Sequence, residues 1–139
     1  DAMLSVMENG RRAIERGRPN VFSPYAQFDE ALNFIEEYIK IGLQWLELKA
    51  PLKVRYEDLL QSYDTEVIRL AEFLSIDPNP EDLKGVFDRY RPESGQSEGK
   101  GLHFSQGKIG RFRTKLDEDQ QAQLSTRLRP YLIRLGYKE

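Results

Sequence analysis

The residues best suited to chemistry in this sequence are two glycines set among basic side chains late in the chain. The group consists of Gly107, Lys108, Gly110, Arg111 and Arg113. Glycine permits positive φ and lets backbone N–H groups approach an anion closely, while lysine and arginine add charge-assisted bonds to phosphate. Such a loop could hold an anion such as a phosphate. A flexible glycine loop with solvated charges is the alternative.

Two further side chains could contact a ligand. Ser5 stands near the start of a predicted helix, where free backbone N–H groups favour an anion, or it is a helix-start serine with no ligand. Tyr56 ends a predicted strand and offers a flat face for stacking, or it is simply the last buried side chain of that strand. Glu57 and Asp58 could serve acid–base chemistry. Adjacent acids at the start of a helix more often cap it, which is the interpretation adopted here.

Composition excludes several classes of function. The 21 basic and 23 acidic residues give a net charge of −2, which removes the simple electrostatic argument for nucleic-acid binding. The absence of cysteine excludes disulfides, thiol catalysis and cysteine-ligated metals, and the lone His103 supports neither a histidine-rich metal site nor a catalytic triad. We therefore expect no metal. No apolar run approaches the roughly 20 residues of a membrane span, and no signal peptide is visible, so a cytoplasmic location is expected.

Helices dominate the predicted elements. One runs from Ala2 to about Arg16, and the clearest runs from about Ala26 to Leu48. In the second, apolar residues recur at helical spacing and aromatic residues widen the stripe, which predicts burial on a broad face. That core stripe consists of Phe28, Ala31, Leu32, Phe34, Ile35, Tyr38, Ile39, Leu43, Trp45 and Leu46.

The remaining pattern predicts one strand and three more helices. Leu52–Tyr56 alternates apolar and basic residues, which indicates a strand. Helices are expected from Asp64 to Leu74, from an Asn79 N-cap, and from a capping box at Asp117 to Pro130, with a long loop between residues 91 and 110. A lone strand needs neighbours to satisfy its edges. The expected fold class is therefore an α/β parent, of which this chain is a mostly helical part with one strand.

Several segments together resemble the sulfotransferase family. Val54–Leu60 and the helix ending Leu70–Leu74 resemble that family's strand ending in Tyr-Glu-Asp-Leu and its following helix. Gly107–Arg113 resembles its Gly-x-x-Gly loop, which continues with Asp or Arg and then Trp or Phe. Asp1–Ser5 is similar to the end of an Arg-x-Pro-x-Asp-x-x-x-Ser segment, and Leu135–Tyr137 matches a common bacterial ending. The resemblance covers nearly the whole chain in the family's order.

The resemblance implies an α/β parent with a parallel sheet. It also implies transfer of a sulfuryl group from 3′-phosphoadenosine 5′-phosphosulfate to a hydroxyl or amine. It places Ser5 and the glycine loop on the 3′-phosphate and Tyr56 against the adenine. The predicted donor-binding residues are thus Ser5, Tyr56, Gly107, Lys108, Gly110 and Arg111. One departure concerns Ser105 and Gln106, where animal cytosolic members carry Arg-Lys.

The family's phosphosulfate loop and catalytic histidine precede the matched region, so residues 1–139 are expected to be the C-terminal part of one sulfotransferase domain. Its catalytic residues stay unknown, and alone it is expected to be inactive. A non-catalytic helical interaction module derived from a sulfotransferase is the alternative, and another nucleotide binder related to P-loop proteins is a third. The expected partners are the sulfate donor, a hydroxyl or amine acceptor and, through Leu52–Tyr56, a second copy of the chain.

Overall fold

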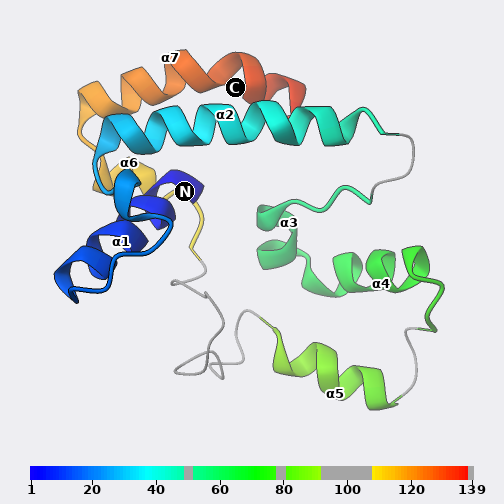
Figure 1. Cartoon of the computed structure of the whole chain (residues 1–139). Coiled ribbons are helices and arrows are strands. Elements are labelled where there is room, and N and C mark those ends of the chain that lie inside the picture. Colours follow the sequence, from blue (N-terminus) through cyan, green and yellow to red (C-terminus); the bar gives the residue numbers. More distant parts are fainter. Residues whose placement is uncertain (49–51, 78–80, 92–107, 138–139) are drawn as a thin grey trace. The chain divides into compact units, whose positions relative to one another are not determined.

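The computed structural model describes residues 1–48, 52–77, 81–91 and 108–137. They belong to two compact units, each treated separately below (Figure 1). The first unit comprises Asp1–Lys49 and Lys108–Glu139, and the second comprises Ala50–Gly107. The chain thus leaves the first unit after its long helix and returns to it at Lys108, which brings the N-terminal helix and Gly110 into one unit.

The first unit is built from helices alone within its described residues. These are α1 (Ala2–Glu15), the 3₁₀ turn η1 (Ser23–Tyr25), α2 (Phe28–Leu46), α6 (Phe112–Lys115) and α7 (Glu118–Arg134). Helix α2 runs alongside α7, and α1 packs against α2 and η1 (Figure 1). The predictions of α1 and α2 are confirmed to within two residues at each end.

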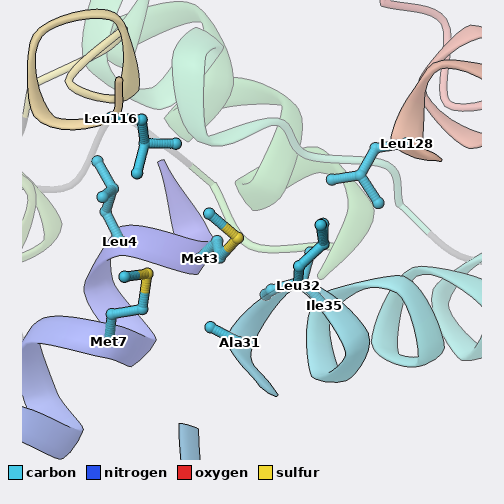
Figure 2. Packing of buried hydrophobic residues seen from close by; sticks show 8 residues of the cluster. All are labelled: Met3, Leu4, Met7, Ala31, Leu32, Ile35, Leu116 and Leu128. Atoms are coloured by element: carbon cyan, nitrogen blue, oxygen red, sulfur yellow. The ribbon is translucent and has the colours of Figure 1, made fainter. Parts of the chain in front are cut away.

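The core of this unit lies where α1, α2 and α7 meet. Its buried members are Met3, Leu4, Met7, Ala31, Leu32, Ile35, Leu116 and Leu128, which Figure 2 shows converging from these segments. Leu116 lies just after α6, so the segment that carries the glycine turn is attached to this core. Of the stripe predicted on α2, Tyr38 and Trp45 are 63% and 64% exposed, so their assignment to the core is wrong.

A polar edge joins α2 to α7. Arg127 on α7 donates from Nε to Glu36 Oε2 at 3.0 Å and from Nη2 to Asn33 Oδ1 at 2.9 Å. Tyr131 donates to Glu36 Oε1 at 3.1 Å. The Arg127 bond and the Tyr131 hydroxyl lower the pKa of Glu36, although burial opposes them. This network fixes the register of the two helices beside the apolar contacts.

The sequence predicts both ends of α7, and one of the two predictions is correct. The capping box is confirmed, since Asp117 accepts from the Gln120 N–H at 2.8 Å and Gln120 accepts from the Asp117 N–H at 3.3 Å. The predicted end at Pro130 is wrong, because α7 continues to Arg134. Tyr131 and Leu132 pack against the core, and this packing outweighs the hydrogen bond that a proline removes from a helix interior.

The second unit contains α3 (Tyr56–Gln61), α4 (Tyr63–Phe73) and α5 (Glu81–Arg89). Tyr63 donates its hydroxyl to the Phe87 carbonyl at 2.9 Å, which ties α4 to α5. Arg91 bonds Asp64 and Asp88, and its bond to Asp64 is the main cause of the lowered pKa of that carboxyl. The predicted N-cap Asn79 lies outside the described residues.

The predicted strand and the α/β fold class are wrong. Residues 52–55 have no regular structure, Tyr56 begins α3, and the described part of the chain contains no strand. Arg55 has extended backbone angles but acts as the N-cap of α3, whose first turn holds Glu57 and Asp58. Two acids beside a helix N-terminus favour helix over strand. The Lys53 carbonyl accepts from Arg69 at 3.2 Å, so a side chain replaces a sheet neighbour there. The expected self-association through Leu52–Tyr56 loses its basis with the strand.

Candidate anion-binding site

The N-terminal helix carries a polar stripe. Asp1, Ser5, Glu8 and Arg12 are spaced by four, three and four residues, which places them on one face of α1. Arg12 reinforces this stripe by approaching Glu8 Oε2 at 3.6 Å and by donating from Nε to the Glu8 carbonyl at 3.2 Å. Met3, Leu4 and Met7 point instead into the core (Figure 2). Helix α1 is thus anchored by its apolar face, and the stripe is available for other contacts.

The glycine turn precedes α6. Gly110 has φ +80°, a value that L side chains rarely adopt, and Arg111 follows with helical angles. The Gly110 carbonyl then accepts from the Arg113 N–H at 3.1 Å. A left-handed residue followed by a helical one turns successive backbone N–H groups toward the same side, which forms a small nest for an anion. The positive φ of Gly110 is a conformation that its residue type permits, and the binding of a phosphate at this turn stays a prediction.

The group that lies in this nest is a carboxylate of the chain itself. Asp1 accepts from the Gly110 N–H at 2.6 Å through Oδ2 and from the Phe112 N–H at 3.2 Å through Oδ1. These partners are separated by 109 and 111 residues in the sequence. Bonds from N–H groups to a charged acceptor are stronger than neutral ones. The Asp1 side chain therefore fastens the glycine turn to the start of α1.

A second link joins the same two segments about two turns further along α1. The Arg111 guanidinium bonds Glu8 Oε1, and the Arg111 side chain is only 8% exposed. The Arg111 hydrogen bond is the main cause of a lowered pKa of Glu8, with burial acting in the opposite direction and Arg12 and Lys115 adding attraction. The turn is consequently held at two points, by its backbone to Asp1 and by its side chain to Glu8.

The structure brings some of the predicted donor-binding residues together. Ser5 lies between Asp1 and Glu8 on the stripe, so it occupies the side of α1 that faces the glycine turn, and it is exposed. Lys108 is also exposed and lies two positions before Gly110, so the Cα atoms of the two residues are at most about 7 Å apart. Gly110 and Arg111 form the turn itself.

Other predicted residues are not placed beside this site. Gly107 and His103 lie outside the described residues. Tyr56 belongs to the second unit, where it is the first residue of α3 and about half exposed rather than the end of a strand. The assignment of Tyr56 to the adenine stays a prediction.

The sequence analysis missed Asp1 and Glu8 as members of the site. Asp1 was noticed only as part of a motif, and Glu8 was not singled out. The signal in the sequence is their spacing, which places both acids on the same face of α1 as Ser5. Which residues the two acids bond could not be inferred from sequence, since these partners lie more than 100 residues away.

Comparisons of the chain with protein-family models, curated proteins and solved structures find no match. Among the described residues, no group of three or more His, Cys, Asp or Glu side chains could hold a metal ion. No helix in the described ranges has both the length and the apolar character needed to cross a membrane.

Proposed function

We propose that this chain is the donor-binding part of a sulfotransferase that uses 3′-phosphoadenosine 5′-phosphosulfate. One observation carries the proposal. The two segments that resemble the family's 3′-phosphate-binding elements, Asp1–Ser5 and the turn at Gly110, lie far apart in sequence but are joined directly by the Asp1 carboxylate. If the two motif matches were coincidental, the segments that carry them would not be expected to contact each other. Their contact therefore supports a common role.

The proposed roles follow from the chemistry of each group. The Ser5 hydroxyl donates to the 3′-phosphate, and Lys108 contributes positive charge to the same anion. Gly107 is assigned to the phosphate and Tyr56 to the adenine by the resemblance alone. During transfer, the bond between sulfur and the bridging phosphate oxygen breaks, a bond from sulfur to the acceptor oxygen or nitrogen forms, and the acceptor loses a proton. We assign the proton-accepting group to no residue of this chain.

The proposal is tested by calorimetric titration of the full-length protein that contains this chain. Adenosine 3′,5′-bisphosphate should bind at least tenfold more tightly than adenosine 5′-monophosphate, which lacks the 3′ group. The Lys108→Ala variant should lose most of this preference. Arg16→Ala is the matched control, since it removes one positive charge from the opposite end of α1, about 16 Å from Ser5 along the helix axis. Equal affinities for the two nucleotides in the wild type would refute the proposal.

The alternative is a non-catalytic helical interaction module. It is favoured by a second apolar face on α2, where Tyr38, Ile41 and Trp45 recur at helical spacing. These three side chains, and that of Leu48 just after the helix, are all more than half exposed. Large exposed apolar groups that gather on one face are typical of interaction surfaces. A module of this kind requires no 3′-phosphate preference, so the same titration separates the two functions.

A further inference from the structure

The candidate site contains an electrostatic conflict. Two carboxylates, those of Asp1 and Glu8, lie on the stripe that includes Ser5, although negative charges beside a phosphate site repel the phosphate. Both carboxylates are bonded to the glycine turn, Asp1 to two backbone N–H groups and Glu8 to the Arg111 guanidinium. These bonds indicate that the two carboxylates have a structural role at the site, even though they would repel a phosphate bound nearby.

The geometry of Asp1 indicates what that role is. Asp1 is the N-cap of α1, a position where aspartate usually accepts from the N–H groups of its own first helical turn. Within the described α1, its side chain makes no such cap bond. It gives both carboxylate oxygens to the N–H groups of Gly110 and Phe112 instead. The Asp1 side chain therefore serves to hold the glycine turn rather than to cap α1.

The Arg111 side chain, like that of Asp1, links the glycine turn to α1. Its guanidinium is almost fully buried and bonds Glu8, whereas Lys108 is exposed. Arg111 is therefore suited to fix the turn rather than to meet a ligand from solvent. Charge for an incoming anion is then left to Lys108 at the start of the turn.

We propose that Asp1 and Glu8 are positioning residues that clamp the glycine turn onto α1, so that Ser5 and Lys108 present to the same phosphate. Arg111 acts through Glu8 and does not touch the ligand. The inference rests on the proposed function, because the ligand it positions is the 3′-phosphate of the sulfate donor.

If Asp1 and Glu8 clamp the turn, neutralising either carboxylate should change anion affinity in the direction opposite to that expected from charge repulsion alone. Removing a negative charge beside an anion site raises anion affinity if the carboxylate only repels the ligand. If the carboxylate positions the turn, the same substitution lowers affinity. Asp1→Asn keeps the size of the side chain but places an NH₂ group against one of the two N–H donors, and Glu8→Gln weakens the bond to Arg111. Neither change alters the apolar face of α1.

The experiment measures the affinity of the full-length protein for adenosine 3′,5′-bisphosphate and adenosine 5′-monophosphate. Asp1→Asn should weaken bisphosphate binding about tenfold or more and Glu8→Gln several-fold, with little change for the monophosphate. Glu15→Gln, which removes an exposed carboxylate at the far end of α1, should change neither. Unchanged or increased bisphosphate affinity in Asp1→Asn and Glu8→Gln would overturn the proposal.

Amide hydrogen exchange separates failure of the clamp from failure of the proposed function. The Gly110 and Phe112 amides should exchange slowly in the wild type and at least tenfold faster in Asp1→Asn, while amides within α7 keep their rates. A wild type that does not bind the bisphosphate would refute the proposed function and the ligand part of this inference. Unaltered exchange at Gly110 and Phe112 in Asp1→Asn would refute the clamp itself, whatever the protein binds.

Discussion

Two glycines in helices of the first unit make a matched pair for testing its packing. Gly10 is buried in α1, and a Cβ added there would lie 2.4 Å from the Phe22 carbonyl oxygen and 3.4 Å from the Ala26 Cα. Gly42 lies in α2, where an added Cβ would meet no atom within 4 Å among the described neighbours. The same substitution, glycine to alanine, should therefore have opposite effects at the two positions.

The magnitudes follow from helix propensity and steric overlap. Alanine in a helix interior is favoured over glycine by about 1 kcal/mol, so Gly42→Ala should stabilise the unit by up to that amount. At Gly10 the new methyl group meets backbone rather than a flexible side chain, and relief requires α1 to move away from η1 by about 1 Å. Overpacking of this kind costs about 1–3 kcal/mol. After the propensity gain, Gly10→Ala should be destabilised by up to about 2 kcal/mol.

Urea unfolding followed by circular dichroism at 222 nm would measure both changes. Since both glycines belong to the first unit, both substitutions should move the same transition, in opposite directions and with unchanged slope. If Gly10→Ala proved as stable as Gly42→Ala, α1 would not approach the Phe22 backbone as described. The position of the Asp1–Glu8 stripe would then be in doubt as well.

Three further predictions concern the contacts that hold the site. Glu8 has a lowered pKa in the folded state, so its stabilising contribution is present above its ordinary value of 4.5 and is lost as pH falls through the lower folded value. The stability difference between the wild type and Glu8→Gln should accordingly be constant above about pH 5 and shrink below it, as urea titrations at each pH would show. Asp117→Ala should lower stability by about 1 kcal/mol through loss of the α7 cap, measured by thermal unfolding. Gly110→Ala and Gly17→Ala both place alanine at positive φ and should each cost about 1–2 kcal/mol, but only Gly110→Ala should weaken binding of adenosine 3′,5′-bisphosphate.

Features set by nearby residues could be predicted from the sequence. The apolar spacing along Phe28–Leu46 predicts α2 because one face of a helix is determined by residues three and four apart. The capping box at Asp117 was predictable because both partners lie within one turn. The prediction of a strand at Leu52–Tyr56 was wrong because strand formation depends on residues that are distant in the sequence. Five alternating residues form a strand only beside a partner strand, and here the two acids after Tyr56 favour the start of α3.

The candidate site was predictable only in part. The positive φ of Gly110 follows from its residue type and its setting in a predicted turn. The pairing of Asp1 with Gly110 and of Glu8 with Arg111 depends on how the chain returns to the first unit at Lys108, which no local pattern encodes. Arg111 illustrates the difference. Its sequence neighbours suggest a phosphate ligand, whereas its buried position and its bond to Glu8 indicate a structural attachment.

We propose that the face of α1 beside the glycine turn binds the 3′-phosphate of a sulfate donor. The most direct measurement is the ratio of affinities for adenosine 3′,5′-bisphosphate and adenosine 5′-monophosphate in the full-length protein, for the wild type and Ser5→Ala. Loss of one bond to a charged group corresponds to about 1.5–3 kcal/mol, or roughly ten- to a hundredfold. We expect Ser5→Ala to lose this factor in affinity for the bisphosphate alone. Equal ratios in the wild type and Ser5→Ala would contradict the proposal.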